Sequence, residues 1–412
     1  MPPLTQASAA EAPPTLLDAL AHAPAAAALI VAVLGQLDRR ALRLTHSQLR
    51  DAVGEATTKL AVNLSVAAAA RPPTPRRWPR LEELRAFGPR DLAALEALGS
   101  NTWGRLRTLS VGDRIEHIHS ALDAPTARAL AAALRRMPAL RALELWSVVL
   151  SDAAAAELFR ASSAEAAPQL RTLCIIEAEL APAAARLLAA TGWRLEELNL
   201  HSNRSLGAAG LAVLLAAPNF ALRRLNLGYC GLGAADVLTL AAAPWPLEEL
   251  DLSRNDFSAA AAGPALAALS RHRGLRRLDV GHCRLSAAGF KALVEAAWPA
   301  LTHLSAADAK VAFSGFDALG AAAFAGFPAL EELDLLCMWF GKTGAALLAS
   351  RRWERLRELN LCGTRLGDAG LAALARGEWP ALEVLDMRAN TLGAPPTLED
   401  ARRWAPALVE LH

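Results

Sequence analysis

Histidine and cysteine are the residue types of this 412-residue chain best suited to act as nucleophiles, general bases or metal ligands. The nine histidines are scattered, and neither a C-x-x-C nor an H-x-x-x-H pair occurs among them and the five cysteines. A G-x-S-x-G nucleophile turn and a Walker-type glycine loop are also absent. His117 and His119 are near neighbours, for which a loop role is the simpler interpretation. The sequence predicts no catalytic residues, no metal ligands and no cofactor.

A second group of residues has the chemistry of a protein interface. Tyr229, Arg254, His282 and Asp308 follow one another at intervals of 25, 28 and 26 residues. Tyr, Trp and Arg dominate the energetics of many interfaces, often at more than about 2 kcal/mol each. Such regular spacing requires a repeated structural element that carries one of these residues per copy.

That element is the pattern L-x-x-L-x-L, with successive copies 25 to 30 residues apart. The copies begin at Leu140, Leu170, Leu195, Leu222, Leu247, Leu275, Leu301, Leu330, Leu356 and Leu382, with degenerate copies at Leu81 and Leu106 and a half copy at Leu408. Alternating side chains place the leucines of each L-x-L on one face of a short strand, and a helical apolar run follows. One copy cannot bury its leucines alone, so stacked copies must share a core. We therefore expect an α/β solenoid, a horseshoe with a concave parallel β-sheet and convex helices, preceded by a small helical segment.

The copies LEELNLHSNRSL from Leu195 and LRELNLCGTRLGDAGLAALA from Leu356 resemble the leucine-rich repeat family, in the subclass of ribonuclease inhibitor and the cysteine-containing F-box repeats. The resemblance covers about residues 80–412 and implies a repeat domain over 81–412 of about 12 copies, the last one incomplete. It also implies a protein-binding role. In the family, the ninth residue of each copy hydrogen-bonds loop backbone, which implies a structural role for Cys230 and Cys283.

Numbering each copy L-x-x-L-x-L-x-x as positions 1 to 8 separates the surfaces of the sheet. Positions 3, 5 and 7 point out of the concave face, and position 8 lies at its rim. Trp146 and Ile176, both at position 7, predict an exposed apolar patch. Position 5 is mostly acidic or amide, for which a solvated ladder is the alternative to a binding site. The partner-binding residues that we expect are Trp146, Ile176, His201, Tyr229, Arg254, His282, His303 and Asp308.

Tryptophan recurs just before the first leucine of many copies. The residues are Trp78, Trp103, Trp193, Trp245, Trp298, Trp353, Trp379 and Trp404. We expect these indoles to fill the turn between a helix and the next strand; a tryptophan cage for a ligand is the alternative. Proline follows four of them and ends the preceding helix.

The amino-terminal part differs from the repeats. Residues 1–15 are rich in Pro and Ala and predict a disordered tail, 16–65 have helical apolar spacing, and 66–80 form a Pro/Arg linker. Residues 28–56 resemble a degenerate F-box, which implies that they bind a Skp-type adaptor. The residues that would contact it are Leu29, Val33, Leu34, Leu37, Leu42, Leu49 and Val53. The F-box's usual Leu-Pro opening is absent. The alternative is a helical cap over the first repeat.

Composition narrows the class of partner. Lys+Arg 43 against Asp+Glu 41 give a net charge of +2, which provides no electrostatic footprint for nucleic acid or an acidic membrane. The few cysteines and the absence of a secretory or membrane-spanning pattern favour a cytoplasmic location, with the nucleus as the alternative. His412 ends the sequence in a strand pattern, which predicts either a truncated product or pairing through that edge.

Two functions agree with these features. The F-box resemblance implies a substrate receptor of a cullin-type ubiquitin ligase. The alternative is a non-catalytic enzyme regulator or scaffold of the ribonuclease-inhibitor or Ran GTPase-activator type, in which the amino-terminal helices are only a cap.

Overall fold

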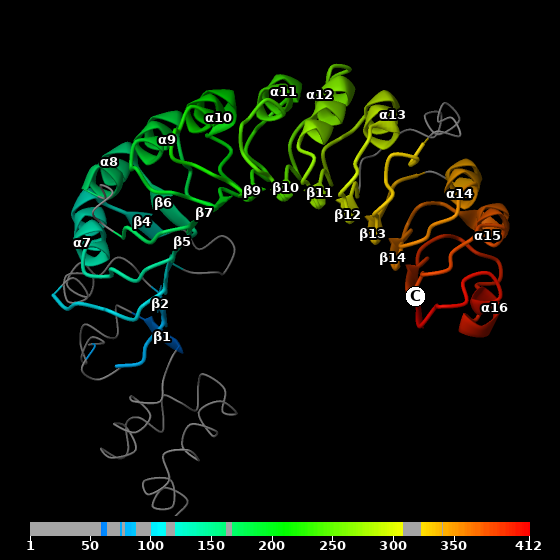
Figure 1. Cartoon of the computed structure of the whole chain (residues 1–412), viewed down its shortest axis with the longest axis horizontal. Helices are drawn as coiled ribbons and strands as arrows, with labels where there is room; N and C mark the ends of the chain where they lie inside the picture. Colours follow the sequence, from blue (N-terminus) through cyan, green and yellow to red (C-terminus); the bar gives the residue numbers. More distant parts are fainter. Residues whose placement is uncertain are drawn as a thin grey trace, which may run out of the picture.

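The repeats of the chain stack into an open arc, with the sheet on the inside and the helices on the outside (Figure 1). The computed structural model describes residues 59–63, 75, 79–87, 100–112, 120–161, 167–307, 323–339 and 341–412. This is the expected α/β horseshoe. The disordered tail, the adaptor-binding residues 29–53 and most of the 66–80 linker lie outside the described residues and stay predictions.

Among the described residues, fourteen parallel strands form the concave sheet in the order of the sequence. Each copy contributes one strand, and the position-4 leucines stand in register, as Leu225, Leu250 and Leu278 do. The strands are β1 Lys59–Asn63, β2 Glu83–Phe87, β3 Thr108–Gly112, β5 Ala142–Trp146, β7 Thr172–Ile176, β8 Glu197–Asn199, β9 Arg224–Asn226, β10 Glu249–Asp251, β11 Arg277–Asp279, β12 His303–Ser305, β13 Glu332–Asp334, β14 Glu358–Asn360, β15 Val384–Asp386 and β16 Glu410–Leu411.

The amino-terminal end of the sheet corrects the expectation that 16–65 is helical throughout. Residues 59–63 form β1, which pairs in parallel with β2, and the Lys59 ammonium lies 2.7 Å from the Glu83 carboxylate. The apolar residues Leu60 and Val62 alternate with period two, as a strand requires. In the described part of the chain, the sheet therefore includes one strand before the first degenerate copy. A separate two-stranded ribbon, β4 Ser120–Leu122 and β6 Val148–Leu150, was not predicted.

The helices cover the outer side of the sheet (Figure 1). They are α7 Ala124–Leu134, α8 Asp152–Ala161, α9 Pro182–Ala189, α10 Gly207–Leu215, α11 Ala234–Leu240, α12 Ala262–Ala268 with the short 3₁₀ turn η1 Leu269–Arg271, α13 Ala287–Glu295, α14 Gly341–Ala349, α15 Gly367–Leu374 and α16 Leu398–Arg402. Asp123, Ser286 and Thr397 cap helices with their side chains, whereas Leu206 and Leu366 stand at helix starts without such a bond. Among the described residues, no helix combines the length and hydropathy needed to cross a bilayer.

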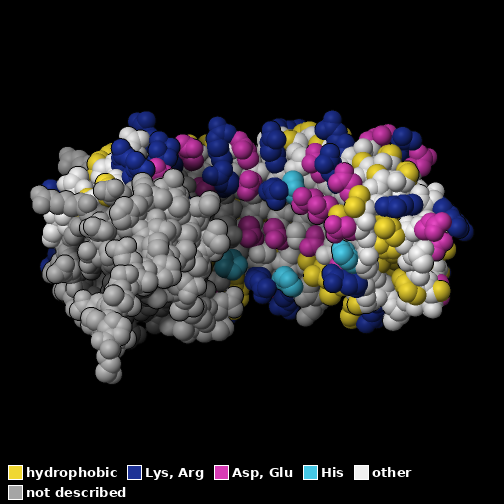
Figure 2. Space-filling model, turned by 90° about the horizontal axis from the view of Figure 1, so that it is seen from below, with side chains coloured by type: hydrophobic (Ala, Val, Ile, Leu, Met, Phe, Trp, Pro, Cys, Tyr) yellow, Lys and Arg dark blue, Asp and Glu magenta, His cyan; other side chains and the backbone are white. Residues whose placement is uncertain are grey.

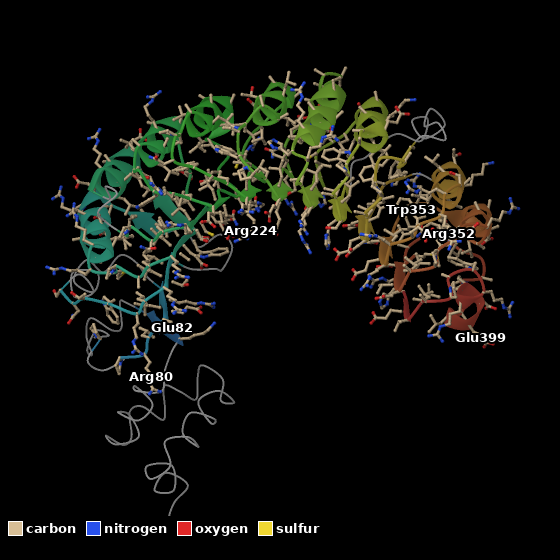
Figure 3. All side chains as sticks on the ribbon, viewed as in Figure 1. Arg80, Glu82, Arg224, Arg352, Trp353 and Glu399 are labelled. Atoms are coloured by element: carbon tan, nitrogen blue, oxygen red, sulfur yellow. The ribbon has the colours of Figure 1, made fainter. Side chains whose placement is uncertain are left out.

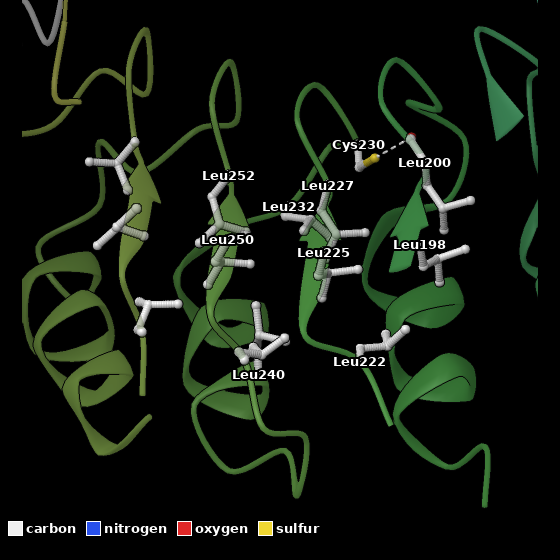
Figure 4. Packing of buried hydrophobic residues seen from close by; sticks show 14 of the residues in the cluster. Leu198, Leu200, Leu222, Leu225, Leu227, Cys230, Leu232, Leu240, Leu250 and Leu252 are labelled. Atoms are coloured by element: carbon white, nitrogen blue, oxygen red, sulfur yellow. Dashed lines mark hydrogen bonds between the residues drawn. The ribbon is translucent and has the colours of Figure 1, made fainter. Parts of the chain in front are cut away.

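Leucines of neighbouring copies form one continuous core between the sheet and the helices. Leu198, Leu225 and Leu250 are at most 2% exposed, and Leu227 and Leu252 are fully buried (Figure 4). The apolar residue that follows each loop also points inward, as expected. These residues are Leu206, Leu232, Phe257, Leu285 and Leu366, each no more than 2% exposed. Stacking thus buries side chains that a single copy would leave in water.

The tryptophans fill the turns between helix and strand, as predicted. Six of them are at most 4% exposed: Trp103, Trp193, Trp245, Trp298, Trp353 and Trp379. Three indole N–H groups donate to a carbonyl of the last helical turn five residues earlier: Trp298 to Leu293, Trp353 to Leu348 and Trp379 to Leu374, at 2.9 to 3.0 Å. Carbonyls of the last helical turn have no i+4 partner within the helix, so the indoles supply hydrogen bonds there; the Leu374 carbonyl also accepts the Gly377 N–H at 2.9 Å. Trp78 lies outside the described residues, and Trp404 is half-buried.

Asparagine at position 9 joins three copies to their neighbours through buried hydrogen bonds. The Asn255 amide donates to the carbonyls of Leu227 and Leu252 at 2.8 Å each, and its Oδ1 accepts the N–H groups of Cys230 and Leu232. Asn203 and Asn390 make similar sets of bonds to their own preceding copies.

Cysteine replaces asparagine at position 9 in two copies and keeps one of these bonds. The Cys230 thiol donates to the Leu200 carbonyl at 3.1 Å, and the Cys283 thiol to that of Leu252 at the same distance (Figure 4). Burial raises the pKa of both thiols to about 12, so they stay protonated at neutral pH. The structural role implied for Cys230 and Cys283 is confirmed.

Replacing Asn255 with alanine is expected to lower the free energy of unfolding by about 2–4 kcal/mol, because two buried N–H groups and two carbonyls lose a partner. Urea unfolding followed by circular dichroism measures the change. Leu238→Ala is the control, since Leu238 is 51% exposed on α11 and its truncation leaves no buried polar group without a partner. Equal losses in the two variants would contradict the role of Asn255.

Candidate partner-binding surface

Position 8 places one left-handed residue per copy at the edge where the strands end. The residues are Ser147, Glu177, Ser202, Tyr229, Arg254, His282, Cys337, Gly363 and Ala389, with φ from 49° to 69°. In the first eight, the backbone N–H donates to the position-7 carbonyl of the next copy, at 2.6 to 3.1 Å. The stacking therefore imposes a conformation that side chains other than glycine adopt reluctantly.

Tyr229, Arg254 and His282 project from three consecutive left-handed turns. Tyr229 is 42% exposed, and Arg254 and His282 are also exposed. The Arg204 guanidinium carbon lies 5.4 Å from the centre of the Tyr229 ring, a cation–π arrangement. Within the described residues, the Arg254 side chain makes no hydrogen bond or ion pair. We call Arg204, Tyr229, Arg254 and His282 the rim surface.

Strand spacing of about 4.8 Å makes these turns neighbours, so the rim surface is continuous along the edge. Figure 2, which views the molecule from its concave side, shows Lys, Arg and His side chains along the edges and a row of acidic side chains between them. Asp308 lies outside the described residues, and its place beside His282 stays a prediction.

The prediction of an exposed apolar patch at Trp146 and Ile176 is wrong for Ile176, because its side chain is only 8% exposed. Trp146 is half-buried, and its indole N–H donates to a Glu144 carboxylate oxygen at 3.1 Å. Ile176 stands in register with Trp146 on one side, and His201 follows in the next copy on the other. Alternation along the strand gives the face on which Ile176 lies and not how far its side chain is covered there.

His201 and His303 lie on the concave side in different settings. His201 is half-buried over Gly228, where a Cβ would come within 2.5 Å of its Nδ1, so the glycine makes room for the imidazole. The Nε2 of His303 lies 2.8 Å from the Arg277 guanidinium and 2.7 Å from the Glu332 carboxylate. Arg224 points into the concave space and pairs with Glu197 at 2.7 Å (Figure 3). Position 3 therefore holds two groups of bonded charges, Glu197 with Arg224 and His303 with Arg277 and Glu332.

Position 5 has a structural role that the sequence did not reveal. Its side-chain Oδ1 accepts the backbone N–H of position 7 in seven copies, at 2.7 to 3.0 Å. The residues are Asn199, Asn226, Asp251, Asp279, Asp334, Asn360 and Asp386. The N–H groups of positions 6 and 8 bond the next copy, so position 7 is the one that needs this side chain. The hydrogen bond in the turn thus accounts for the acidic and amide residues at position 5 without a bound ligand.

The carboxylates of this row differ in their electrostatics. Burial raises the pKa of Asp279, and the neighbouring carboxylates of Asp251 and Asp334 add to the rise. Burial likewise raises the pKa of Asp334. Asp386 has its pKa lowered by hydrogen bonds from the Arg388 guanidinium, at 2.5 to 3.1 Å. The centre of the concave face therefore holds repelling carboxylates, whereas its last strands hold a paired one.

Trp339 is a candidate that the sequence analysis missed. Its side chain is 38% exposed, and the Arg365 guanidinium carbon lies 3.7 Å from its ring centre. Both residues occupy position 10 of successive copies, as Arg204 does in its own copy. A large aromatic residue two places after position 8 was the available signal.

Asp279→Asn keeps the oxygen that accepts the Gly281 N–H and removes a repelled charge. Because the pKa of Asp279 is higher in the folded chain than in the unfolded chain, ionisation of this carboxyl lowers the free energy of unfolding as the pH rises through the folded pKa. The variant is therefore expected to melt about 1–3 °C higher than the native chain at pH 7, with the gain vanishing below about pH 4. Asp386→Asn is the control. The pKa of Asp386 is lowered in the folded chain, so its ionised form stabilises the fold and the variant should melt at a lower temperature than the native chain at pH 7. Scanning calorimetry across pH measures both, and a lower Tm for Asp279→Asn at pH 7 would contradict the assignment.

The comparisons with known proteins agree with this repeat architecture. Residues 356–375 match the family model described as "Leucine Rich repeat". A chain in the crystal structure of the Rad7 and Elc1 complex in yeast is 17% identical, with a TM-score of 0.50, over 93% of this chain and 90% of that one. A chain of the TLR13–ssRNA13 complex is 19% identical, with a TM-score of 0.41, over 85% of this chain and 40% of that one. No curated protein matches the sequence. The fold is that of the leucine-rich repeat solenoids.

Proposed function

We propose that the chain is a non-catalytic receptor that captures a protein partner on its concave face and rim surface. The observation that carries this proposal is the exposure of Tyr229 and Arg254 in left-handed turns. Glycine would occupy those turns with less strain, and neither side chain has a packing role in the core. A large aromatic side chain beside a guanidinium that has no ion pair among the described residues is a combination that anchors interfaces.

The partner is a protein rather than a nucleic acid on electrostatic grounds. Between its edges the concave face carries a row of carboxylates, which would repel a phosphate backbone. The net charge of +2 adds no long-range attraction. Large side chains held on a rigid sheet edge suit a folded or extended protein surface better.

The finer proposal is a substrate receptor of a cullin-type ubiquitin ligase, active in the cytoplasm or nucleus. Its support is the resemblance of residues 28–56 to an F-box, which implies that a Skp-type adaptor binds there. Rad7, whose complex contains a chain of similar fold, was crystallised with Elc1, so an Elc1-type adaptor is a reasonable second bait. If neither binds, the enzyme-regulator alternative is favoured.

Tyr229→Gly and Arg254→Gly are expected to reduce partner capture at least about fivefold while Tm stays within about 1 °C or rises, because glycine relieves the left-handed strain. Affinity capture with quantitative mass spectrometry, alongside thermal denaturation, measures both effects. Leu238→Ala is the control: Leu238 lies on helix α11 of the outer layer and is 51% exposed, so this variant should leave capture intact. Alanine is used because glycine would destabilise the helix. A large drop in Tm with glycine at 229 would show that Tyr229 belongs to the fold.

Co-purification tests the adaptor proposal with the full chain. We expect the native chain to retain a Skp-type adaptor, and a Leu34→Asp, Leu42→Asp double variant to lose it about tenfold or more, because charge replaces apolar contacts. The rim variants serve as the control and should bind the adaptor normally. Absence of retention by the native chain with both adaptor types would reject the ligase role.

A further inference from the structure

The edge of the sheet where the strands begin carries a hollow of about 430 Å³, opposite the rim surface. Its walls come from neighbouring copies: Pro244, Trp245 and Pro246 on one side, and the loop between η1 and β11 on the other. Arg271 ends η1, and that loop contributes Arg273 and Arg276; all three are exposed. We call these three residues and the two prolines the arginine hollow.

Position 2 elsewhere on this edge forms a ladder of arginine–glutamate pairs between successive copies. The pairs are Arg171–Glu196 at 3.5 Å, Arg223–Glu248, and Arg357–Glu383 at 3.8 Å. Arg276 is at the same position, but the next copy offers it Thr302, whose hydroxyl donates to the Arg276 carbonyl at 3.0 Å. The only carboxylate that lines the hollow, Glu248, already pairs with Arg223.

The three guanidinium groups thus have no carboxylate partner. Within the described residues, none of Arg271, Arg273 and Arg276 makes an ion pair or a side-chain hydrogen bond. Three like charges in six residues repel one another, and an anion between them would remove that repulsion. Guanidinium groups bind phosphoryl oxygens with charge-assisted, often bidentate, hydrogen bonds.

The loop that presents these arginines is held in place. The His272 ring nitrogen Nε2 lies 3.2 Å from the carbonyl of Leu240, the last residue of α11. The His272 carbonyl accepts the Leu275 N–H at 2.9 Å, and the Arg276 N–H donates to the Glu248 carbonyl at 2.7 Å. A backbone fixed at both ends needs little ordering when a ligand binds.

We propose that the arginine hollow binds the phosphoryl group of a phosphorylated segment of a protein partner. The exposed Pro244 and Pro246 give the hollow an apolar wall for the backbone or side chains that flank the phosphorylated residue. A nucleic acid would need a long stripe of cations, whereas this cluster is confined to one loop. The inference rests on the proposed function only in taking the partner to be a protein.

Thr302→Glu is the sharpest test, because it restores the missing glutamate of the ladder and leaves every arginine in place. Glu331 occupies the equivalent position in the next copy, and Glu248 occupies it two copies before, so the fold accommodates the substitution. Isothermal titration of the full chain would use a short synthetic peptide in three forms, with phosphoserine, glutamate or serine between prolines. Arg276→Gln is the second variant, and Arg357→Gln, an arginine already paired with glutamate, is the matched control.

The phosphoserine peptide should bind the native chain and Arg357→Gln alike, and bind Thr302→Glu and Arg276→Gln about tenfold or more weakly. It should bind more tightly than the glutamate form, and the serine form should bind least. Equal affinity of the native chain and Thr302→Glu for the phosphoserine peptide would overturn the site.

Two further probes identify the class of ligand. Inorganic phosphate, followed by ³¹P line broadening, reports on the hollow without any protein partner; broadening by phosphate with no binding of the phosphopeptide would overturn the peptide assignment. A single-stranded oligonucleotide that bound more tightly than the peptide, and weakened with Thr302→Glu, would do so as well. The rim surface lies on the other edge of the sheet and is tested by capture with the rim variants. Failure of the proposed function would therefore appear in that assay and not in the peptide titration.

Discussion

Every copy in this chain depends on hydrogen bonds and leucine contacts supplied by the next copy. A three-residue strand such as β9 has too few contacts to be stable alone. Its backbone N–H groups reach the carbonyls of the neighbouring copy, and Asn255 binds backbone groups of two copies at once. Because the partner of each group lies about one strand spacing away, the path of every loop is constrained to match its neighbour. The left-handed position 8 is a direct result of that constraint.

The same constraint separates residues that hold the fold from residues that are available to bind. Positions 1, 4, 6 and 9 are buried, and position 5 completes the turn through its Oδ1. Positions 8 and 10 and the start of each strand need only a backbone conformation, so their side chains are not required for packing. Tyr229, Arg254 and Arg276 stand at such places. One edge of the sheet then presents an aromatic and cationic surface, and the other presents a cluster of arginines that have no ion pair in the part of the chain that the structure describes.

Most of the architecture could be predicted from the spacing of leucines, because burial of an L-x-L pair requires a strand and a stack. The burial of Leu232, of Phe257 and of the tryptophans in the turns could be predicted from the same repeat spacing. The sequence could not show that Asp251 and Asp279 close a turn, because an outward carboxylate in a strand looks identical whether it bonds water or backbone. The burial of Ile176 was not predicted for a related reason: alternation gives the face on which a side chain lies and not how far it is covered there. Residues 59–63 were read with the helical segment before them, although Leu60 and Val62 already alternate as in a strand. The arginine hollow was missed because it becomes visible only when Arg276 is set beside Thr302 of the next copy.

The central claim is that the rim surface, and not the helical layer, contacts the protein partner. A photo-crosslinking amino acid placed at position 229, and separately at position 238 on α11, tests this in the full chain. Irradiation during partner capture should join the partner to the chain modified at 229, with little product from 238. Crosslinking from 238 without crosslinking from 229 would place the partner on the convex helices and contradict the account.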